Sequence, residues 1–280
     1  MQEMRSTASA HLIVRDLSKV YKSRDGLVPA LESCTLEVPN GGFSVLVGPS
    51  GCGKTTLLNI IAGFDAPSSG EVHLGQDLIA AEGMTLRPGP DRMVVFQQGG
   101  LFPWMTALAN VCYGPVTQGR MTRSQAREKA RELLAKVGLT GIENSYPGDM
   151  SSGMRRRVEI IRALIIRPRV LLMDEPFRAL DALTKSVMHD FLLRLYDAEP
   201  YTIFFITHDL IESIYLGDTV TVMTTRPGRI KQVFSVDLAR PRSHKALASR
   251  EFLRLKAAVT EAVHEEAVKA FVAGERELAK

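Results

Sequence analysis

The chain has 280 residues, with 35 Lys and Arg against 31 Asp and Glu and a formal net charge of +4. The basic residues are scattered rather than gathered in stripes, which argues against a nucleic-acid partner. No apolar run approaches the roughly 20 residues that span a bilayer, and the length allows one large α/β domain with a smaller inserted or appended part.

The cysteines and the N-terminal residues indicate in which cellular compartment the chain resides. Cys34, Cys52 and Cys112 are odd in number and lack metal-ligand spacing, so we expect free thiols in a reducing environment. The first residues contain no apolar core typical of a signal peptide. We therefore expect a cytosolic chain that acts at a membrane only through a partner.

The first predicted elements are antiparallel strands. Apolar and polar residues alternate from about 11 to 22, turn near 23–26, and resume at 27–38 before a turn at 39–42. Tyr21 ends the first strand. An aromatic there could stack on a purine, since the chain has no N-K-x-D run to bind guanine, although a strand-end packing residue is the simpler interpretation.

Residues 43–56, FSVLVGPSGCGKTT, predict a strand, a glycine loop and a helix. Gly48, Gly53, Lys54 and Thr55 match G-x-x-x-x-G-K-[ST], in which backbone N–H groups converge on phosphate oxygens, the lysine adds charge and the hydroxyl serves Mg²⁺. Chance should produce this match only on the order of one time in a hundred chains of this length. The remaining residues of the predicted phosphate site are Pro49, Ser50, Gly51, Cys52 and Thr56.

A turn is predicted at 67–70 and a short strand at 71–74. A further strand is predicted at 92–96, and Gln97 follows it. Ligands of α/β sheets bind at the carboxyl ends of parallel strands. Gln97 could therefore reach Mg²⁺ or an attacking water, with a solvated loop residue as the alternative.

From about residue 105 to 167 helical apolar spacing replaces the strands, which predicts a helical insertion in the sheet domain. Ser151, Ser152 and Gly153 precede an amphipathic helix at 154–166, so a helix N-terminus offers a second anion site. The three arginines at 155–157 on that helix are expected to form a solvated face.

The apolar run 170–173 predicts a central parallel strand that is covered on both faces. Two carboxylates follow it, Asp174 and Glu175, and they are costly there unless a cation or a reaction uses them. Since neighbours on a strand point in opposite directions, we expect different roles. Asp174 would hold Mg²⁺ through water and Glu175 would act as general base, although Glu175 alone could also cap the next helix.

The last predicted strands lie at 202–206 and 220–223. His208 follows the first of them and could contact a γ-phosphate, although a histidine at a strand end is usually a loop residue. A tight turn is expected at 226–229. The amphipathic tail at 249–271 predicts a packing helix, with a partner-docking helix as the alternative.

The motifs together resemble the nucleotide-binding cassette of ABC transporters, in family order. The matching set is Tyr21, GPSGCGKT, Gln97, the SSGM helix start, LLMDEP, Ala179-Leu180-Asp181 and His208. VFQ-x-x-x-LFPW, DEPFRALDALTK and TTRPGRI are similar to stretches in the ATPase subunits of nitrate, sulfonate, taurine and bicarbonate importers. The resemblance implies an α/β P-loop NTPase cassette at 11–236 with an antiparallel β-subdomain, an inserted helical subdomain at about 100–167, and a helical tail at 237–280.

The resemblance also implies roles and partners. Tyr21 would stack on adenine, Gly48 to Thr56 would hold the phosphates of ATP and, at Thr55, Mg²⁺, and Lys54 would take part in catalysis. Gln97 would sense the ion and Asp174 would bind it. Glu175 would activate water, and His208 would act as a switch that contacts the γ-phosphate. Asp181 would lie in a dimer-interface loop, and Ser151 and Gly153 would complete the site of a second copy. Permease subunits and, indirectly, a periplasmic binding protein would be the other partners, at the cytoplasmic face of the inner membrane, in the import of small anionic or sulfonate-like nutrients.

Two positions depart from the family pattern. Ser152 replaces the first glycine of L-S-G-G-Q, where backbone closely approaches phosphate, and Arg178 stands where relatives usually have a small residue. An exporter ATPase and a soluble cassette without transport function remain alternatives. A P-loop kinase or GTPase would have no use for the helix start at Ser151, and a catalytically dead cassette would be expected to lack Glu175 or His208.

Overall fold

The structure is a computed structural model that describes residues 10–23, 26–85 and 87–278. Its centre is a six-stranded sheet in the order β10-β9-β3-β8-β7-β6, in which all neighbours are parallel except β10 and β9. The strands are β3 (Phe43–Val47), β6 (Arg92–Val95), β7 (Val170–Asp174), β8 (Ile203–Ile206), β9 (Thr219–Met223) and β10 (Ile230–Ser235). The carboxyl ends of the parallel strands therefore share one edge.

The central strand β7 is covered on both faces, as its unbroken apolar run predicts. Val170 and Leu172 belong to one hydrophobic core, whereas Leu171 and Met173 belong to another. Because alternate side chains of a strand point to opposite faces, the two cores lie on opposite sides of the sheet.

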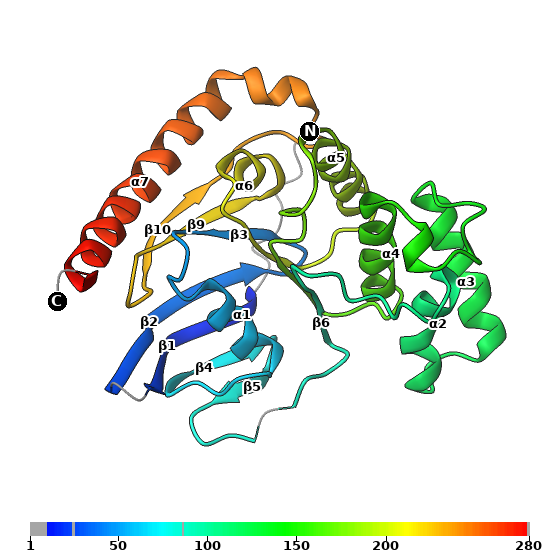
Figure 1. Cartoon of the computed structure of the whole chain (residues 1–280), viewed down its shortest axis with the longest axis horizontal. Helices are drawn as coiled ribbons and strands as arrows, with labels where there is room; N and C mark the ends of the chain where they lie inside the picture. The colour runs from blue at the N-terminus through cyan, green and yellow to red at the C-terminus, as the bar shows by residue number, and fades with distance from the viewer. Residues whose placement is uncertain (1–9, 24–25, 86, 279–280) are drawn as a thin grey trace.

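An antiparallel sheet forms the second layer, in the order β2-β1-β4-β5. Its strands are β1 (Ala10–Ser23), β2 (Gly26–Pro39), β4 (Ser69–Leu74) and β5 (Asp77–Ala81). The helix α1 (Lys54–Ala62) follows the glycine loop and lies between the two sheets (Figure 1). Its buried leucines and isoleucines share one core with both layers, so the loop before it is held between them.

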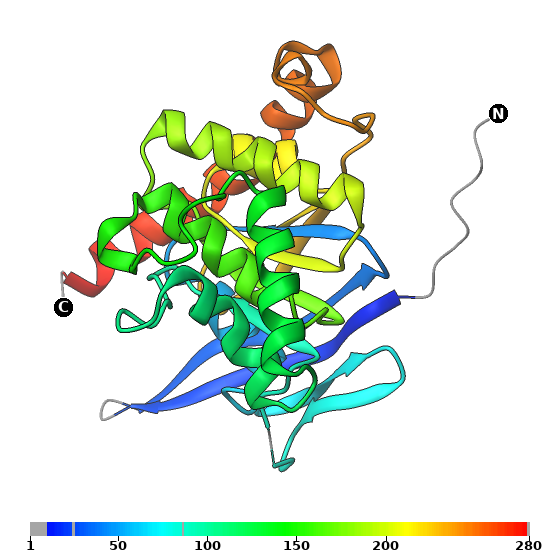
Figure 2. The ribbon, with the colours of Figure 1, turned by 90° about the vertical axis from the view of Figure 1, so that its right-hand side faces the viewer.

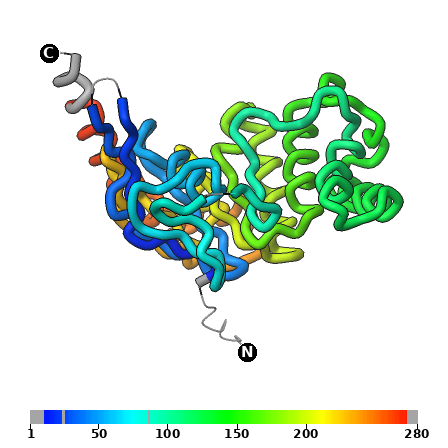
Figure 3. The backbone as a smooth tube through the Cα atoms, turned by 90° about the horizontal axis from the view of Figure 1, so that it is seen from below, coloured from blue at the N-terminus to red at the C-terminus, as the bar shows by residue number. Residues whose placement is uncertain are grey.

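Three helices lie between β6 and β7 in the chain: α2 (Ala107–Thr117), α3 (Arg123–Lys136) and α4 (Ser152–Leu164), with a 3₁₀ turn at Pro147–Asp149. They stand to one side of the sheets and face the viewer in Figure 2; Figure 3 shows the same separation from below. Ser151 caps α4 by accepting a hydrogen bond from the backbone N–H of Met154 at 3.3 Å. The helical segment expected from about 105 to 167 is present.

The remaining helices are α5 (Ala182–Ala198), α6 (Leu210–Leu216) and α7 (Arg250–Leu278), with a second 3₁₀ turn at His244–Ala248. The long α7 runs along the outside of β9, β10 and α6 (Figure 1). Within the described ranges, no helix is both long and apolar enough to cross a membrane. Cys34, Cys52 and Cys112 are buried free thiols.

A few expected boundaries were wrong. The turn expected at 67–70 overlaps β4, which begins at Ser69, and β5 and β10 were not expected as strands. The strand expected to end at residue 96 ends at Val95. Short edge strands such as β5 and β10 depend on pairing with a neighbour rather than on their own sequence pattern, which is why periodicity misses them.

Candidate active site

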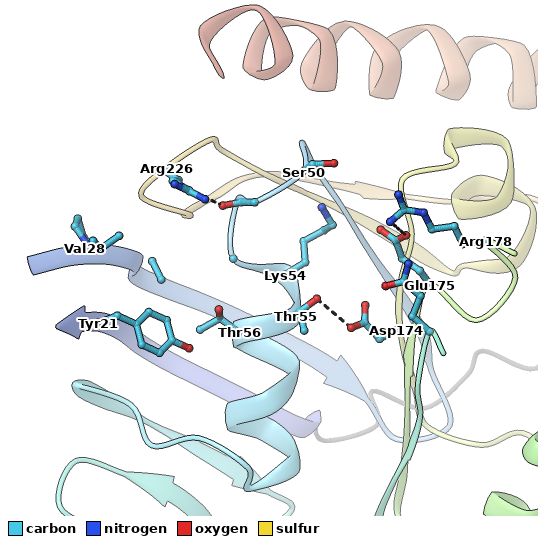
Figure 4. A pocket seen from close by; sticks show the side chains of 15 residues that line it. Tyr21, Val28, Ser50, Lys54, Thr55, Thr56, Asp174, Glu175, Arg178 and Arg226 are labelled. Carbon is cyan, nitrogen blue, oxygen red and sulfur yellow. Dashed lines mark hydrogen bonds and ion pairs between the residues drawn. The ribbon is translucent and has the colours of Figure 1, made fainter. Parts of the chain in front are cut away.

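A pocket of about 400 Å³ opens at the carboxyl edge of the central sheet (Figure 4). It lies between the glycine loop, the end of β7 and the β1–β2 hairpin. Its lining residues are Tyr21, Val28, Pro29, Ala30, Ser50, Gly51, Gly53, Lys54, Thr55, Thr56, Gln97, Asp174, Glu175, Arg178 and Arg226.

The glycine loop has a backbone that only glycine adopts easily at its tip. Gly51 and Gly53 have φ angles of +74° and +100°, in the left-handed region. A Cβ at Gly53 would lie 2.8 Å from the carbonyl oxygen of Ala30. The helix α1 begins at Lys54 directly after the loop, so its N-terminal N–H groups and dipole face the pocket.

Lys54 spans this loop from within. Its ammonium donates hydrogen bonds of 2.8 Å to the carbonyl oxygens of Gly48 and Pro49, and the residue is 7% exposed. A cation held at the centre of an N–H-lined loop creates a site for a polyphosphate anion.

Oxygen atoms suited to a hard divalent cation lie beside the loop. The hydroxyl of Thr55 donates to Oδ2 of Asp174 at 3.0 Å. Burial raises the pKa of Asp174, and the nearby charge of Glu175 raises it further, against the opposing hydrogen bond from Thr55. Mg²⁺ is usually held by one or two carboxylates together with substrate phosphates. This donor set therefore fits Mg²⁺, which would also relieve the unfavourable burial of the Asp174 charge.

Glu175 points into the same pocket as Asp174, and the expectation of opposite directions was wrong. The strand β7 ends at Asp174, and Glu175 has a φ of +42°, a strained conformation for a residue with a Cβ. The turn brings both carboxylates to the pocket. Oε2 of Glu175 lies 3.1 Å from Nδ1 of His208 and 3.1 Å from Nη1 of Arg178.

Tyr21 lies on the hairpin wall of the pocket, next to Val28 (Figure 4). Its hydroxyl donates to Oδ2 of Asp65 at 2.6 Å, and the ammonium of Lys19 lies 4.8 Å from the ring centroid. Burial, followed by the hydrogen bond to Asp65, raises the pKa of Tyr21. The ring is therefore neutral and fixed in position where a planar base could lie against it.

Of the predicted glycine-loop residues, Gly48, Pro49 and Cys52 do not line the pocket, and three further predicted site residues lie outside both the loop and the pocket. Ser151 and Gly153 begin α4, and Asp181 caps α5 by accepting from the backbone N–H of Thr184 at 3.0 Å. These residues line no part of the 400 Å³ pocket, and His208 reaches it only through Glu175. The predicted site thus separates into one group around Lys54 and another around Ser151.

The expectation that the arginines at 155–157 form a solvated face was wrong for Arg156. Its guanidinium is buried and lies 2.6 Å from Oε2 of Glu159. It donates to the carbonyl oxygens of Phe96 and Gln97 at 2.8 and 2.9 Å, and Glu159 accepts from the N–H of Gly100 at 2.9 Å. The helix that begins at Ser151 is therefore bonded to the loop that carries Gln97.

Sequence reasoning did not assign two arginines that line the pocket. Arg178, noted only as a departure from the family pattern, forms the ion pair with Glu175 described above. Arg226 donates from Nε to the carbonyl oxygen of Gly51 at 3.1 Å. The signal for Arg226 is its place in the turn after the last parallel strand, at the sheet edge where ligands bind.

Comparison with known proteins identifies the family, because residues 31–178 match the family model described as ABC transporter. The chain belongs to the ABC transporter family. An uncharacterized ABC transporter ATP-binding protein of Methanocaldococcus jannaschii is 42% identical over 95% of this chain and 96% of its own length. The bicarbonate transport ATP-binding protein CmpD of Synechocystis sp. is 42% identical over 84% of this chain and 82% of its own. The nitrate import ATP-binding protein NrtD of Synechocystis sp. is 40% identical, over 81% and 83%.

Solved structures give the same result. The ATP-binding cassette MJ0796, in a dimeric post-hydrolysis state bound to ADP and Pi, matches with a TM-score of 0.68 and 28% identity, over 81% of this chain and all of that chain. A second dimeric structure of that bacterial ABC transporter cassette matches with a TM-score of 0.69 and 29% identity. The predicted fold class is confirmed, and the chain is an ATP-binding, ATP-hydrolysing ABC subunit.

Proposed function

We propose that this ABC ATPase energises a membrane importer of small anions and that it hydrolyses ATP with Mg²⁺ in the pocket around Lys54. One observation carries the proposal: a phosphate loop, a Thr55–Asp174 oxygen pair and a bonded Glu175 lie within one pocket of about 400 Å³. Phosphoryl transfer needs positioning and charge stabilisation more than covalent chemistry from the protein, and these groups supply both.

In this proposal each residue of the pocket has a defined task. Tyr21 supports the adenine, and Lys54 exchanges its hydrogen bonds to Gly48 and Pro49 for bonds to phosphate oxygens. Thr55, Asp174 and Gln97 hold Mg²⁺, which supplies neutralisation of phosphate charge. Glu175 takes the proton of the attacking water as general base.

Two contacts prepare Glu175 for that role. Its bond to His208 aims the carboxylate and links it to a residue that can donate to the γ-phosphate. The ion pair with Arg178, at 3.1 Å, holds the same carboxylate oxygen from a second side. Arg178 lies half-exposed, so this ion pair is weakened by solvent.

We also propose that Ser151, Gly153 and Asp181 complete the nucleotide site of a second copy. Support comes from their position outside the pocket of their own chain and from the dimeric state of the two cassette structures that match. A helix N-terminus that lies at the surface, away from the pocket of its own chain, can contact the phosphate of a nucleotide that a second molecule binds.

We propose that the chain has two parts. Residues 11–236 form the cassette, with its helical subdomain at about 100–167, and residues 237–280 form an appended helical tail. Permease subunits and, through them, a periplasmic binding protein are the proposed partners, at the cytoplasmic face of the inner membrane. The similarity to proteins named for bicarbonate transport and nitrate import supports import of small anions.

The central test is Glu175→Gln. The amide keeps the shape of the side chain but cannot accept the proton, so hydrolysis should fall by about 10²–10⁴-fold while ATP binding stays intact. With ATP and Mg²⁺ the variant should accumulate as a dimer in light scattering. Turnover at the wild-type rate would remove Glu175 from the role of base.

The substrate class can be tested separately. The chain would be reconstituted with its permease in vesicles, and ATP hydrolysis would be measured with bicarbonate, nitrate or an alkyl sulfonate and the periplasmic binding protein. Stimulation by one of these anions supports the import proposal. Stimulation by none of them, alongside normal hydrolysis, would refute the anion assignment and leave the ATPase assignment in place.

A further inference from the structure

The turn at 224–229 touches the phosphate loop directly. Arg226 donates to the carbonyl oxygen of Gly51, the left-handed residue at the tip of the loop, at 3.1 Å (Figure 4). A Cβ on Gly228 would lie only 2.1 Å from the carbonyl oxygen of Cys52. The backbone of the turn thus packs against the phosphate loop with no room for a side chain between them.

The other side of the same turn is held by the C-terminal helix α7. The backbone N–H of Thr225 donates to Oε2 of Glu266 at 3.0 Å, and Glu266 is 1% exposed. Lys231 and Lys269 lie 3.1 and 2.7 Å from the other carboxylate oxygen. A buried carboxylate is costly unless it is paired, and Glu266 is paired with both lysines. Its position is therefore fixed, and its bond to Thr225 holds the residue next to Arg226 in place.

Arg226 carries a charge that the protein itself does not neutralise. Within the described part of the chain, no carboxylate oxygen lies within 4.0 Å of its guanidinium, whereas Arg229 in the same turn pairs with Glu32 at 2.6 Å. Arg226 lines the pocket beside Ser50 and Gly51. A cation without a carboxylate, beside an N–H-lined loop, suits a phosphate oxygen.

We propose that Arg226 is an additional cation of the nucleotide site and that α7 positions it through Glu266. The C-terminal helix then contributes to nucleotide affinity from the outside of the sheet, through its bond to this turn. The inference rests on the proposed location of the nucleotide around Lys54. It assigns to α7 a positioning role in addition to packing.

The experiment compares four variants of the full chain: Arg226→Ala, Arg226→Lys, Glu266→Ala and Glu265→Ala. Glu265 is the matched control, because it is the neighbouring carboxylate on α7 and pairs with Lys231 at 2.5 Å but does not bond Thr225. The dissociation constants of ADP and of adenosine are measured by calorimetry at low and moderate salt.

We expect Arg226→Ala to weaken ADP binding by about tenfold, in line with loss of a charge-assisted hydrogen bond. Adenosine binding should not change, and the ADP defect should shrink at higher salt because screening weakens an exposed charge. Arg226→Lys should recover part of the affinity, and Glu266→Ala should weaken ADP binding by roughly threefold, whereas Glu265→Ala should leave it unchanged.

Three results would overturn the inference: unchanged ADP affinity in Arg226→Ala, an equal loss of adenosine and ADP affinity, or equal effects of Glu265→Ala and Glu266→Ala. If Glu266→Ala does not fold, Glu266→Gln replaces it. Its single amide oxygen cannot serve Thr225 and both lysines as the carboxylate does, so ADP binding should again weaken, and wild-type ADP affinity would count against positioning by α7. Lys54→Ala separates this inference from the proposed function. If Lys54→Ala retains full ADP affinity, the proposed location of the nucleotide is wrong; if only Arg226→Ala does, the role of Arg226 is wrong.

Discussion

The group around Lys54 and the group around Ser151 are built differently. The first lies at the junction of a buried strand, a glycine loop and two sheets, and each of its charged side chains has a bonded partner within the chain. The second is a capped helix end on the inserted helical segment, exposed at Ser151. The first group is therefore organised before any nucleotide arrives, whereas the second depends on a facing surface.

The two groups are nevertheless connected within one chain. Arg156 and Glu159, which lie one to two turns after Ser151, bond the backbone of the loop that carries Gln97. Gln97 lines the pocket of the first group. A shift of the helical segment relative to the sheets must therefore move this loop or break these bonds.

The largest effect is expected in the group around Lys54, from Asp174→Asn. Loss of the metal-binding charge should reduce Mg²⁺-dependent turnover by about a hundredfold or more. The same change should raise the melting temperature of the nucleotide-free protein at neutral pH, because burial raises the pKa of Asp174 and makes its ionised form unfavourable in the folded state.

The sign of this stability effect can be checked with pH. A carboxyl whose pKa is raised by folding stabilises the fold when protonated, and that contribution is lost as pH rises through the folded pKa. The gain of Asp174→Asn should therefore disappear as pH falls toward the ordinary carboxyl value of 3.8. Thermal melts that show an equal gain at all pH values would contradict a burial effect.

The next effect concerns the bonds that connect the two groups. Arg156→Gln leaves Glu159 as a buried and unpaired carboxylate, which should lower the free energy of unfolding by about 3 kcal/mol. Adding Glu159→Ala should recover most of that stability, since no buried charge remains. Turnover should stay low in the double variant, because the loop of Gln97 has lost its bonds to α4. Denaturant unfolding and hydrolysis assays measure the two effects, and full turnover in the double variant would argue against the connection.

A smaller effect is expected in the group around Ser151, from Ser151→Ala. Loss of the hydroxyl should reduce turnover by about tenfold without changing the ATP affinity of the monomer. Ser151→Asp is the matched control, because Asp caps a helix as well as Ser but repels a phosphate. If capping alone matters, Ser151→Asp will match the wild type; if Ser151 meets a phosphate, it will be worse than Ser151→Ala. Sedimentation with ATP reports the dimer in each case.

The smallest effect is expected from Ser152→Gly, which restores the glycine that the family pattern has at this position. Removing the side chain should allow closer approach of a facing phosphate and raise turnover by roughly two- to threefold. An unchanged or lower turnover would mean that the serine side chain is accommodated in the closed site. Steady-state hydrolysis at saturating ATP is sufficient to measure this change.

Local patterns in the sequence were enough to predict the first group. The glycine loop, its lysine and the apolar strands that precede Asp174 and Gln97 are contiguous stretches whose conformation follows from residue type alone. By contrast, the burial of Arg156 was not predictable from three adjacent arginines, because its carbonyl partners lie 59 and 60 residues earlier in the chain. The direction of Glu175 was also missed, because a positive φ in a non-glycine residue has no signature in the sequence.

By itself, therefore, the sequence of this protein determined the phosphate loop, the parallel strands around it and the family to which the chain belongs. These are properties of short segments, set by glycine conformation and by hydrophobic periodicity. Only the tertiary structure decided that Asp174 and Glu175 share one pocket, that α4 is bonded to the Gln97 loop, and that Arg226 reaches Gly51 across 175 residues. Such contacts depend on how distant segments pack, and no spacing within one segment encodes them.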